Sequence, residues 1–162
     1  MVQVEGGAAA RERLLEELGT VSRRYMASYA LFNQAFADHL GLHPTDLQCL
    51  NLLALEGGPV TTGRVAELTG LTTGSATRLV DRLERAGYAV RERDVADRRR
   101  VLVATVPEKL AELTRVWDRL GGGYNALFDD LGDGQLALII EHMRRTTRFS
   151  SEQVERLRSG DV

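Results

Sequence analysis

Cysteine is almost absent from this sequence, which has a single one, Cys49, in 162 residues. One cysteine cannot form an internal disulfide, which fits a reducing environment. The sequence also lacks an apolar run long enough to span a bilayer, and its first ten residues contain neither a basic start nor an apolar core. We therefore expect no membrane span and no secretory signal, and we predict a cytoplasmic protein.

Lysine is scarce as well, because 20 of the 21 basic residues are arginine, an imbalance that we attribute to coding bias. The formal net charge of −2 excludes a chain that is basic throughout. Between Thr61 and Thr105, however, nine arginines and six acidic residues give a local net charge of +3, which leaves −5 for the rest. A basic middle between acidic ends is expected of a modular DNA-binding protein, in which the local charge matters more than the total.

The first third of the chain is predicted to be helical. From residue 8 to residue 40, apolar side chains recur at steps of three and four, and Gly41 tolerates the positive φ of a helix end. A second helix is expected to start at His43–Asp46, because a Pro and an acidic residue suit a first turn, and to end at residues 56–59.

The second half of the chain combines a predicted hairpin with two predicted helices. Residues 88–106 break the helical period and end in alternating residues after an Asp- and Arg-rich tip, which is typical of a β-hairpin with a long charged turn. Pro107 suits the first turn of a helix whose apolar residues from Leu110 to Leu131 form a heptad-like seam. A last helix is expected from about Gly134 to Arg158.

Residues 61–86 have the parts of a helix-turn-helix, namely a helix of about two turns, a turn at Gly70 and a longer helix. Thr61 or Thr62 can cap the first helix and Thr72 the second, since a hydroxyl accepts from the free N–H groups of a first turn. The predicted inward stripe of the second helix is Ala76, Leu79, Val80 and Leu83. Its opposite face holds Gly74, Arg78, Asp81 and Arg85, with Thr73 and Thr77 beside them. Hydroxyls and arginines there suit phosphates and base edges, although any small helical protein could show this pattern.

We call the predicted hairpin, residues 88–106, the wing, and its turn is rich in arginine. Arg98, Arg99 and Arg100 are consecutive, and their mutual repulsion is best tolerated where a polyanion supplies the counter-charge. We therefore expect wing arginines to enter a narrow minor groove. Asp97 is expected to hold a neighbouring arginine by a charge-assisted hydrogen bond, because it would face phosphate unfavourably.

Together these elements predict a mainly α fold with a small β-hairpin wing, which is a winged helix-turn-helix with additional terminal helices. We divide the chain into an N-terminal dimerisation helix (8–40), a DNA-binding domain (42–106) and C-terminal dimerisation helices (107–158). The terminal helices have more apolar face than one small core requires, so we expect two copies to pack together as a homodimer.

The sequence resembles the MarR family of bacterial transcriptional regulators. The residues that carry the resemblance are Thr-Arg-Leu-Val-Asp-Arg-Leu-Glu at 77–84 and Asp-Arg-Arg at 97–99, followed by Val-Leu-Val at 101–103. The resemblance covers roughly Leu42 to Glu108. On either side of that segment, the helices match the family in length and order but not in distinctive residues.

The resemblance implies a triangular homodimer with interleaved N- and C-terminal helices. It places Arg99 at the family's minor-groove arginine and Asp97 at its supporting acid. The residues expected at double-stranded DNA are Thr61, Thr62, Thr72, Thr73, Gly74, Ser75, Thr77, Arg78, Asp97, Arg98, Arg99 and Arg100. Members usually repress, and many release DNA when a small amphipathic ligand binds, so a small amphipathic or phenolic effector is expected here.

Three positions depart from the family pattern. Gly74 stands where a side chain usually helps to contact DNA, and Val106 replaces the Thr that commonly caps the helix after the wing. Gly121–Gly123 interrupt the seam of the following helix, at about 1 kcal/mol for each glycine relative to alanine. A bend, close packing or simple tolerance would each account for these glycines.

Other chemically suggestive residues have simpler interpretations. Cys49 is expected to be a buried structural residue more than an oxidation sensor, because no thiolate-stabilising base is evident. His39 and His43 lack further ligands and are separated by Gly41, so we predict no metal site. Trp117, Tyr25 and Tyr29 could line an effector pocket, but aromatic residues at seam spacing are usually core.

The sequence therefore predicts a sequence-specific DNA-binding transcriptional regulator that binds a pseudo-palindromic operator as a dimer and represses until an effector binds. The alternative is a dimeric ligand-sensing or protein-interaction module that has lost DNA binding, for which Gly74 and the acidic ends are the motivation. No catalytic triad, phosphate loop or supported carboxylate pair is visible, so we expect neither an enzyme nor a cofactor.

Overall fold

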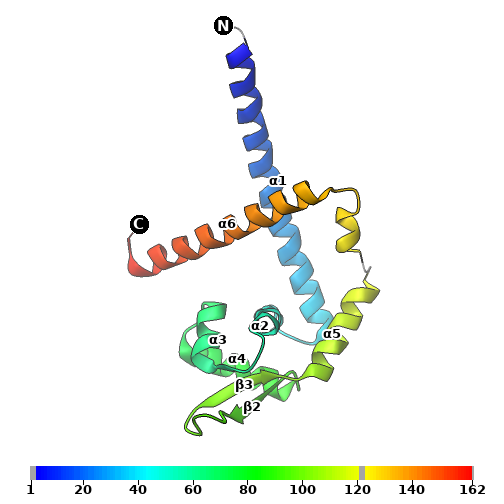
Figure 1. The fold of residues 1–162 in the computed structure, drawn as a ribbon. Helices are drawn as coiled ribbons and strands as arrows, with labels where there is room; N and C mark the ends of the chain where they lie inside the picture. Colours follow the sequence, from blue (N-terminus) through cyan, green and yellow to red (C-terminus); the bar gives the residue numbers. More distant parts are fainter. Residues whose placement is uncertain (1–2, 121–122, 162) are drawn as a thin grey trace. The chain divides into compact units, whose positions relative to one another are not determined.

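The computed structural model describes residues 3–120 and 123–161, with side chains from Gly7 onward, and divides into two compact units. The first unit extends to Ala111 and the second starts at Glu112. Figure 1 draws their helices and strands. The first unit contains α1 (Gln3–Leu40), α2 (Pro44–Leu55), β1 (Val60–Thr61), α3 (Thr62–Thr69), α4 (Thr73–Arg85), β2 (Ala89–Arg93) and β3 (Val101–Thr105). Helix α5 (Pro107–Arg119) crosses from the first unit into the second, which also contains the 3₁₀ helix η1 (Asn125–Phe128) and α6 (Asp133–Ser159).

The helix ends follow the predicted capping residues. Gly41 has a φ of 66°, and the backbone then turns so that Leu42 N donates to the carbonyl of Ala37 at 2.9 Å. Glycine adopts this left-handed conformation without the steric cost of a Cβ, which is why α1 ends where the sequence predicts. His43 caps α2, with its Nδ1 accepting from Thr45 N at 3.3 Å, and Pro44 occupies the first turn.

The sheet has three antiparallel strands in the order β1-β3-β2. Strands β2 and β3 form the predicted hairpin, with Ala89 opposite Thr105 and Arg93 opposite Val101. The sequence analysis missed β1, in which Val60 pairs with Val103. Two residues are too short for an alternating pattern, and β1 exists only because β3 offers a free edge to the segment before α3.

The core of the first unit is built on the predicted inward stripe of α4. Ala76, Leu79, Val80 and Leu83 are all 0% exposed. They pack in a core whose largest fully buried apolar side chains also include Leu47, Leu50, Val65 and Val103. Helix α4 is therefore supported from α2, from α3 and from the sheet, and its remaining face stays in solvent.

One prediction for the helix after the wing is wrong. The heptad-like seam from Leu110 to Leu131 does not lie on one helix, because α5 ends at Arg119 and is followed by η1. Successive glycines disfavour continuation of the helix, since each costs about 1 kcal/mol relative to alanine. Gly121 and Gly122 lie outside the described residues, so the alternatives of a bend, close packing or tolerance stay open.

The long helices α1 and α6 carry large apolar side chains that are exposed to solvent. On α1, the large side chains at least half exposed to solvent are Leu14, Leu15, Val21, Tyr25, Met26, Tyr29 and Leu31. On α6, Leu138, Phe149 and Leu157 are between 61% and 72% exposed. No helix in the described residues is long and apolar enough to cross a membrane.

Candidate nucleic-acid interface

The amino end of α4 presents a connected set of polar side chains. Thr72 caps the helix, with its hydroxyl oxygen accepting from Ser75 N at 3.3 Å. The same hydroxyl donates to Ser75 Oγ at 3.1 Å, and Arg78 Nη2 donates to that Oγ at 3.1 Å as well. The cap predicted at Thr72 is therefore confirmed, and the geometry holds the Arg78 guanidinium over the first turn, where partly positive N–H groups favour an anion.

The outer face of α4 is open to solvent, as the apolar pattern predicts. Thr73, Gly74, Thr77 and Arg78 are exposed, whereas Ser75 is half-buried. The Thr77 hydroxyl donates to the carbonyl of Thr73 at 2.9 Å, so it is already engaged with the helix. A Cβ at Gly74 would meet nothing within 4 Å, and the surface there is open. Because it has no side chain, Gly74 can contribute only backbone to a contact.

Thr61 and Thr62 lie at the start of α3, and both are half-buried. The Thr61 hydroxyl caps the helix by accepting from Arg64 N at 3.1 Å, which assigns the cap that the sequence left open between Thr61 and Thr62. Thr61 also pairs with Leu102 in the sheet. The start of α3 therefore belongs to the same compact unit as α4 and the wing.

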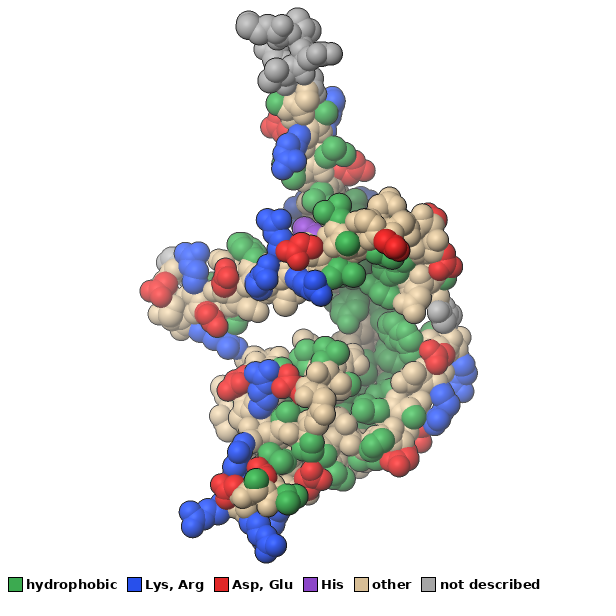
Figure 2. Space-filling model, viewed as in Figure 1, with side chains coloured by type: hydrophobic (Ala, Val, Ile, Leu, Met, Phe, Trp, Pro, Cys, Tyr) green, Lys and Arg blue, Asp and Glu red, His purple; other side chains and the backbone are tan. Residues whose placement is uncertain are grey.

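The tip of the wing contains three consecutive arginines. Arginine side chains, drawn in blue, gather over the loop between β2 and β3, at the lower left of Figure 2. Arg98, Arg99 and Arg100 are all exposed. The Asp97 carboxylate accepts from Arg99 N at 3.1 Å, so the expected contact between Asp97 and an arginine is made through the backbone amide. The Arg100 guanidinium lies 3.7 Å from the carboxylate of Asp94, a partner that the sequence analysis missed.

Arg82 of α4 is held by a buried carboxylate. Its Nε and Nη2 donate to the two oxygens of Asp46 at 2.8 and 2.5 Å. The Asp46 side chain is 3% exposed and that of Arg82 is 41% exposed, so the pair reaches from the core to the surface. Hydrogen bonding to Asp46 raises the pKa of Arg82. This two-point contact ties α4 to the first turn of α2.

A second set of ion pairs ties α4 to β2. Arg91 donates from Nη2 to Asp81 at 2.7 Å and from Nη1 to Glu84, and Glu84 also accepts from Arg91 N at 2.9 Å. Asp81, predicted on the face of α4 opposite the buried stripe, has a side chain that is 47% exposed and also pairs with Arg91 of the wing. The wing and α4 are thus joined by a charged contact besides the shared core.

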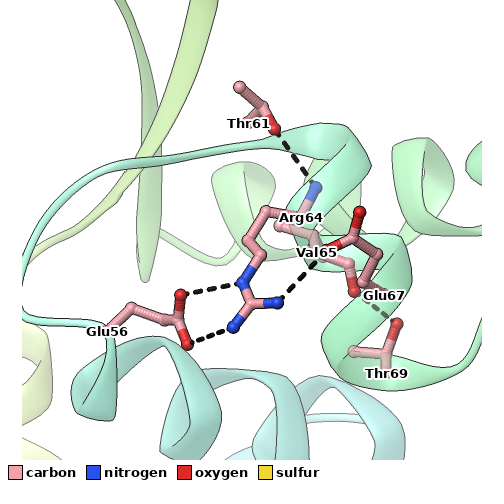
Figure 3. A network of polar contacts seen from close by, with 6 residues as sticks. All are labelled: Glu56, Thr61, Arg64, Val65, Glu67 and Thr69. Atoms are coloured by element: carbon pink, nitrogen blue, oxygen red, sulfur yellow. Dashed lines mark hydrogen bonds and ion pairs between the residues drawn. The ribbon is translucent and has the colours of Figure 1, made fainter.

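Arg64 of α3 is enclosed by two carboxylates (Figure 3). It donates from Nε and Nη2 to Glu56 at 2.9 and 3.0 Å and from Nη1 to Glu67 at 3.1 Å. The hydrogen bonds to Arg64 lower the pKa of Glu56, and the two carboxylates raise that of Arg64. The guanidinium therefore stabilises the junction of α2 with α3 and would have to lose these partners to contact phosphate.

These contacts divide the nine arginines between Thr61 and Thr105 into two groups. Arg64, Arg82, Arg91 and Arg100 face carboxylates. In the described part of the chain, no ion pair involves Arg78, Arg85, Arg93, Arg98 or Arg99, and all five are exposed. The uncompensated positive charge is therefore concentrated on the outer face of α4 and on the wing. That distribution cannot be obtained from the residue counts alone.

Comparisons with known proteins agree with this arrangement. A family model described as MarR family matches residues 40–100. An uncharacterised HTH-type transcriptional regulator of Bacillus subtilis, YcgE, is 38% identical over 146 residues, which cover 90% of each chain. A second such regulator of that organism, YkoM, is 28% identical over 130 residues, covering 72% of this chain and 84% of the relative.

Solved structures of the same family share the fold. A MarR family protein from Bacillus stearothermophilus superposes with a TM-score of 0.65 at 21% identity, covering 86% of this chain and 97% of the other. A MarR family transcriptional regulator from Silicibacter pomeroyi gives 0.64 at 23% identity, covering 83% and 90%. These identities support the winged-helix fold alone. The sequence relationship to YcgE and the family match show that this chain belongs to the MarR family of transcriptional regulators, which bind DNA and are not enzymes.

Proposed function

We propose that this regulator binds a specific pseudo-palindromic operator as a homodimer, with the amino end of α4 in the major groove and the wing tip in the minor groove. The observation that carries the proposal is the location of the unpaired arginines. Arg78 lies on the exposed face of α4, and Arg98 and Arg99 lie at the wing tip, without a carboxylate partner among the described residues. Phosphates and groove edges would supply the missing counter-charge.

Within this interface Arg78 of α4 and the arginines of the wing have different roles. Arg78 projects from the first turns of α4 together with Thr72, Thr73 and Ser75, where a helix in the major groove contacts base edges. Arg99 would enter the minor groove, whose narrow A·T-rich segments attract arginine. Thr61, Thr62 and Arg98 would contact phosphates on either side, and Arg100 would remain near Asp94.

Homodimerisation would use the exposed apolar faces of the terminal helices, residues 8–40 and 107–158. Side chains such as Leu14, Met26 and Leu138 are between 60% and 72% exposed. Burying apolar surface is worth about 25 cal/mol per Å², so association of two copies offsets the cost of this exposure. A two-fold dimer would place its half-sites about one helical turn of DNA apart.

We further propose that the protein is a cytoplasmic repressor that a small amphipathic or phenolic effector releases from DNA. Support comes from BpsR of Bordetella bronchiseptica, whose DNA binding is regulated by 6-hydroxynicotinic acid and whose structure matches with a TM-score of 0.55 at 20% identity, covering 80% of this chain and 91% of that one. Selection of bound duplexes from a random pool, with and without candidate ligands, would identify both the operator and the effector class.

Arg99→Ala tests the interface directly on the selected operator. Loss of a groove-inserted arginine should weaken binding by about 1–3 kcal/mol, which is roughly 5- to 150-fold. Arg148→Ala, at an exposed arginine of α6 that pairs with Glu141, removes the same charge outside the DNA-binding domain; with dimerisation verified as unchanged by sedimentation, it should change affinity by less than about 2-fold. An Arg99→Ala affinity equal to wild type, in a protein with an unchanged thermal transition, would remove Arg99 from the interface.

The alternative, a ligand-sensing or protein-interaction module without DNA binding, is favoured by the absent side chain at Gly74 and by the acidic ends of the chain. Titration with salt separates the two functions. Binding to duplex DNA that falls steeply between low and high salt supports the regulator, because bound counterions are released. No binding to any duplex at low salt would support the sensor module.

A further inference from the structure

The tip of the wing is closed by backbone hydrogen bonds and not by apolar packing. Asp94 N donates to the carbonyl of Arg100 at 3.1 Å, and Arg100 N donates to the carbonyl of Asp97 at 2.9 Å. Val95, the one large apolar side chain in the tip, is 98% exposed. The order of the tip must therefore come from polar contacts, because it has no buried apolar contact of its own.

Asp94 makes more of these contacts than any other side chain in the tip. Its Oδ1 accepts from Ala96 N at 2.8 Å and from Asp97 N at 3.4 Å. Its Oδ2 lies 3.7 Å from Arg100 Nη1. The Asp94 side chain is only 17% exposed, although it belongs to a surface loop. One carboxylate thus restrains three residues of the tip from the position where β2 ends.

The arginines beside this carboxylate are left available. Arg98 and Arg99 are exposed, and no hydrogen bond or ion pair in the described part of the chain engages their guanidiniums. The carboxylates of Asp94 and Asp97 accept hydrogen bonds from backbone amides of the tip. The guanidiniums of Arg98 and Arg99 extend from this restrained backbone. The acids therefore shape the loop without neutralising the charges that would meet DNA.

We propose that Asp94 is a positioning residue for the wing arginines, which presents Arg99 to the minor groove by restraining the tip before DNA is bound. The inference rests on the proposed DNA-binding function. A pre-formed loop binds more tightly because its ordering cost is met during folding and not on binding. Asp94 acts through Arg99 and does not contact DNA itself.

The loss of a negative charge and the loosening of the wing tip have opposite expected effects on the operator affinity of Asp94→Ala. Removing a negative charge next to a polyanion strengthens binding if charge alone matters. Removing the acceptor of two backbone N–H groups loosens the tip and weakens binding if position matters. The sign of the change in operator affinity therefore decides between these roles.

The experiment measures operator affinity, affinity for a scrambled duplex and the thermal transition for Asp94→Ala, Asp94→Asn and Glu92→Ala. Glu92 is the matched control, since it is an exposed acid of β2 opposite Leu102, and its substitution removes the same charge. We expect Asp94→Ala to weaken operator binding by about 5-fold or more without weakening scrambled-duplex binding. Asp94→Asn, whose amide oxygen can accept the same N–H groups, should retain most of the affinity, and Glu92→Ala should not weaken binding.

The same substitution in an Arg99→Ala background completes a double-mutant cycle. If Asp94 acts through Arg99, Asp94→Ala should change operator affinity by less than about 2-fold in that background. An equal loss in both backgrounds would show a general structural effect and overturn the inference. Unchanged or tighter operator binding by Asp94→Ala, while Arg99→Ala weakens it, would overturn the inference and leave the proposed function standing. No effect of Arg99→Ala would refute the minor-groove role on which the inference rests.

Discussion

The buried pair between Asp46 and Arg82 makes a quantitative prediction about stability. Arg82→Met keeps the length of the side chain but leaves the Asp46 carboxylate, which is 3% exposed, without its two charged hydrogen bonds. Removing one partner of a fully buried pair costs about 3–5 kcal/mol. The Arg82 side chain is 41% exposed, so solvent screening lowers the expected loss to about 2–4 kcal/mol.

The two single substitutions, Arg82→Met and Asp46→Leu, should differ strongly in their effect on the free energy of unfolding. Asp46→Leu removes the buried charge and leaves Arg82 able to reach water, so we expect a loss of about 1 kcal/mol. The double variant replaces the pair with two apolar residues, and it should be more stable than Arg82→Met alone by at least about 1 kcal/mol. Adding a second substitution would thus recover stability, because the cost lies in the unpaired carboxylate.

Thermal and urea denaturation at fixed protomer concentration would measure these differences, since association changes apparent stability. A loss of 2–4 kcal/mol corresponds to a decrease in Tm of roughly 5–12 °C for a chain of this size. Arg64→Met is the matched control, because it removes a two-point contact to the solvent-accessible Glu56 and should lower Tm less. A loss below about 1 kcal/mol for Arg82→Met, or a double variant no more stable than it, would refute the reasoning.

Two further predictions follow from single positions. Burial, with the nearby charge of Asp46, raises the pKa of the Cys49 thiol from 9.0 to about 12, so iodoacetamide at pH 8 should label it only after unfolding. The free energy of unfolding should fall as the pH rises from about 9 to about 12, because the thiol ionises more readily in the unfolded chain. Rapid labelling of the folded protein would contradict this assignment. Gly74→Ala should raise stability by up to about 1 kcal/mol, because a Cβ there meets nothing and alanine favours a helix. Gly87→Ala should lower stability, because Gly87 has a φ of 77°. A Tm that falls for Gly74→Ala and rises for Gly87→Ala would be inconsistent with both assignments.

Local patterns were sufficient for most of the first unit. The stripe of Leu79 and Leu83 predicted the buried face of α4, and Thr72 and Gly41 predicted where helices start and end. These features succeed because helix period and capping act over a few consecutive residues. The continuous seam after Pro107 failed because a regular apolar spacing does not itself show whether the intervening glycines permit one helix.

In the candidate interface too, local patterns predicted some features and the packing of elements decided others. The sequence by itself determined that a basic wing follows a capped helix, since the arginines are consecutive and the hairpin and helix patterns are local. Only the tertiary structure decided which arginines remain unpaired. Arg82 meets Asp46 from 36 residues away, and Arg91 meets Asp81 across the junction of β2 with α4. Such pairs depend on how elements pack, because a charge is neutralised by its neighbours in space and not by its neighbours in the chain.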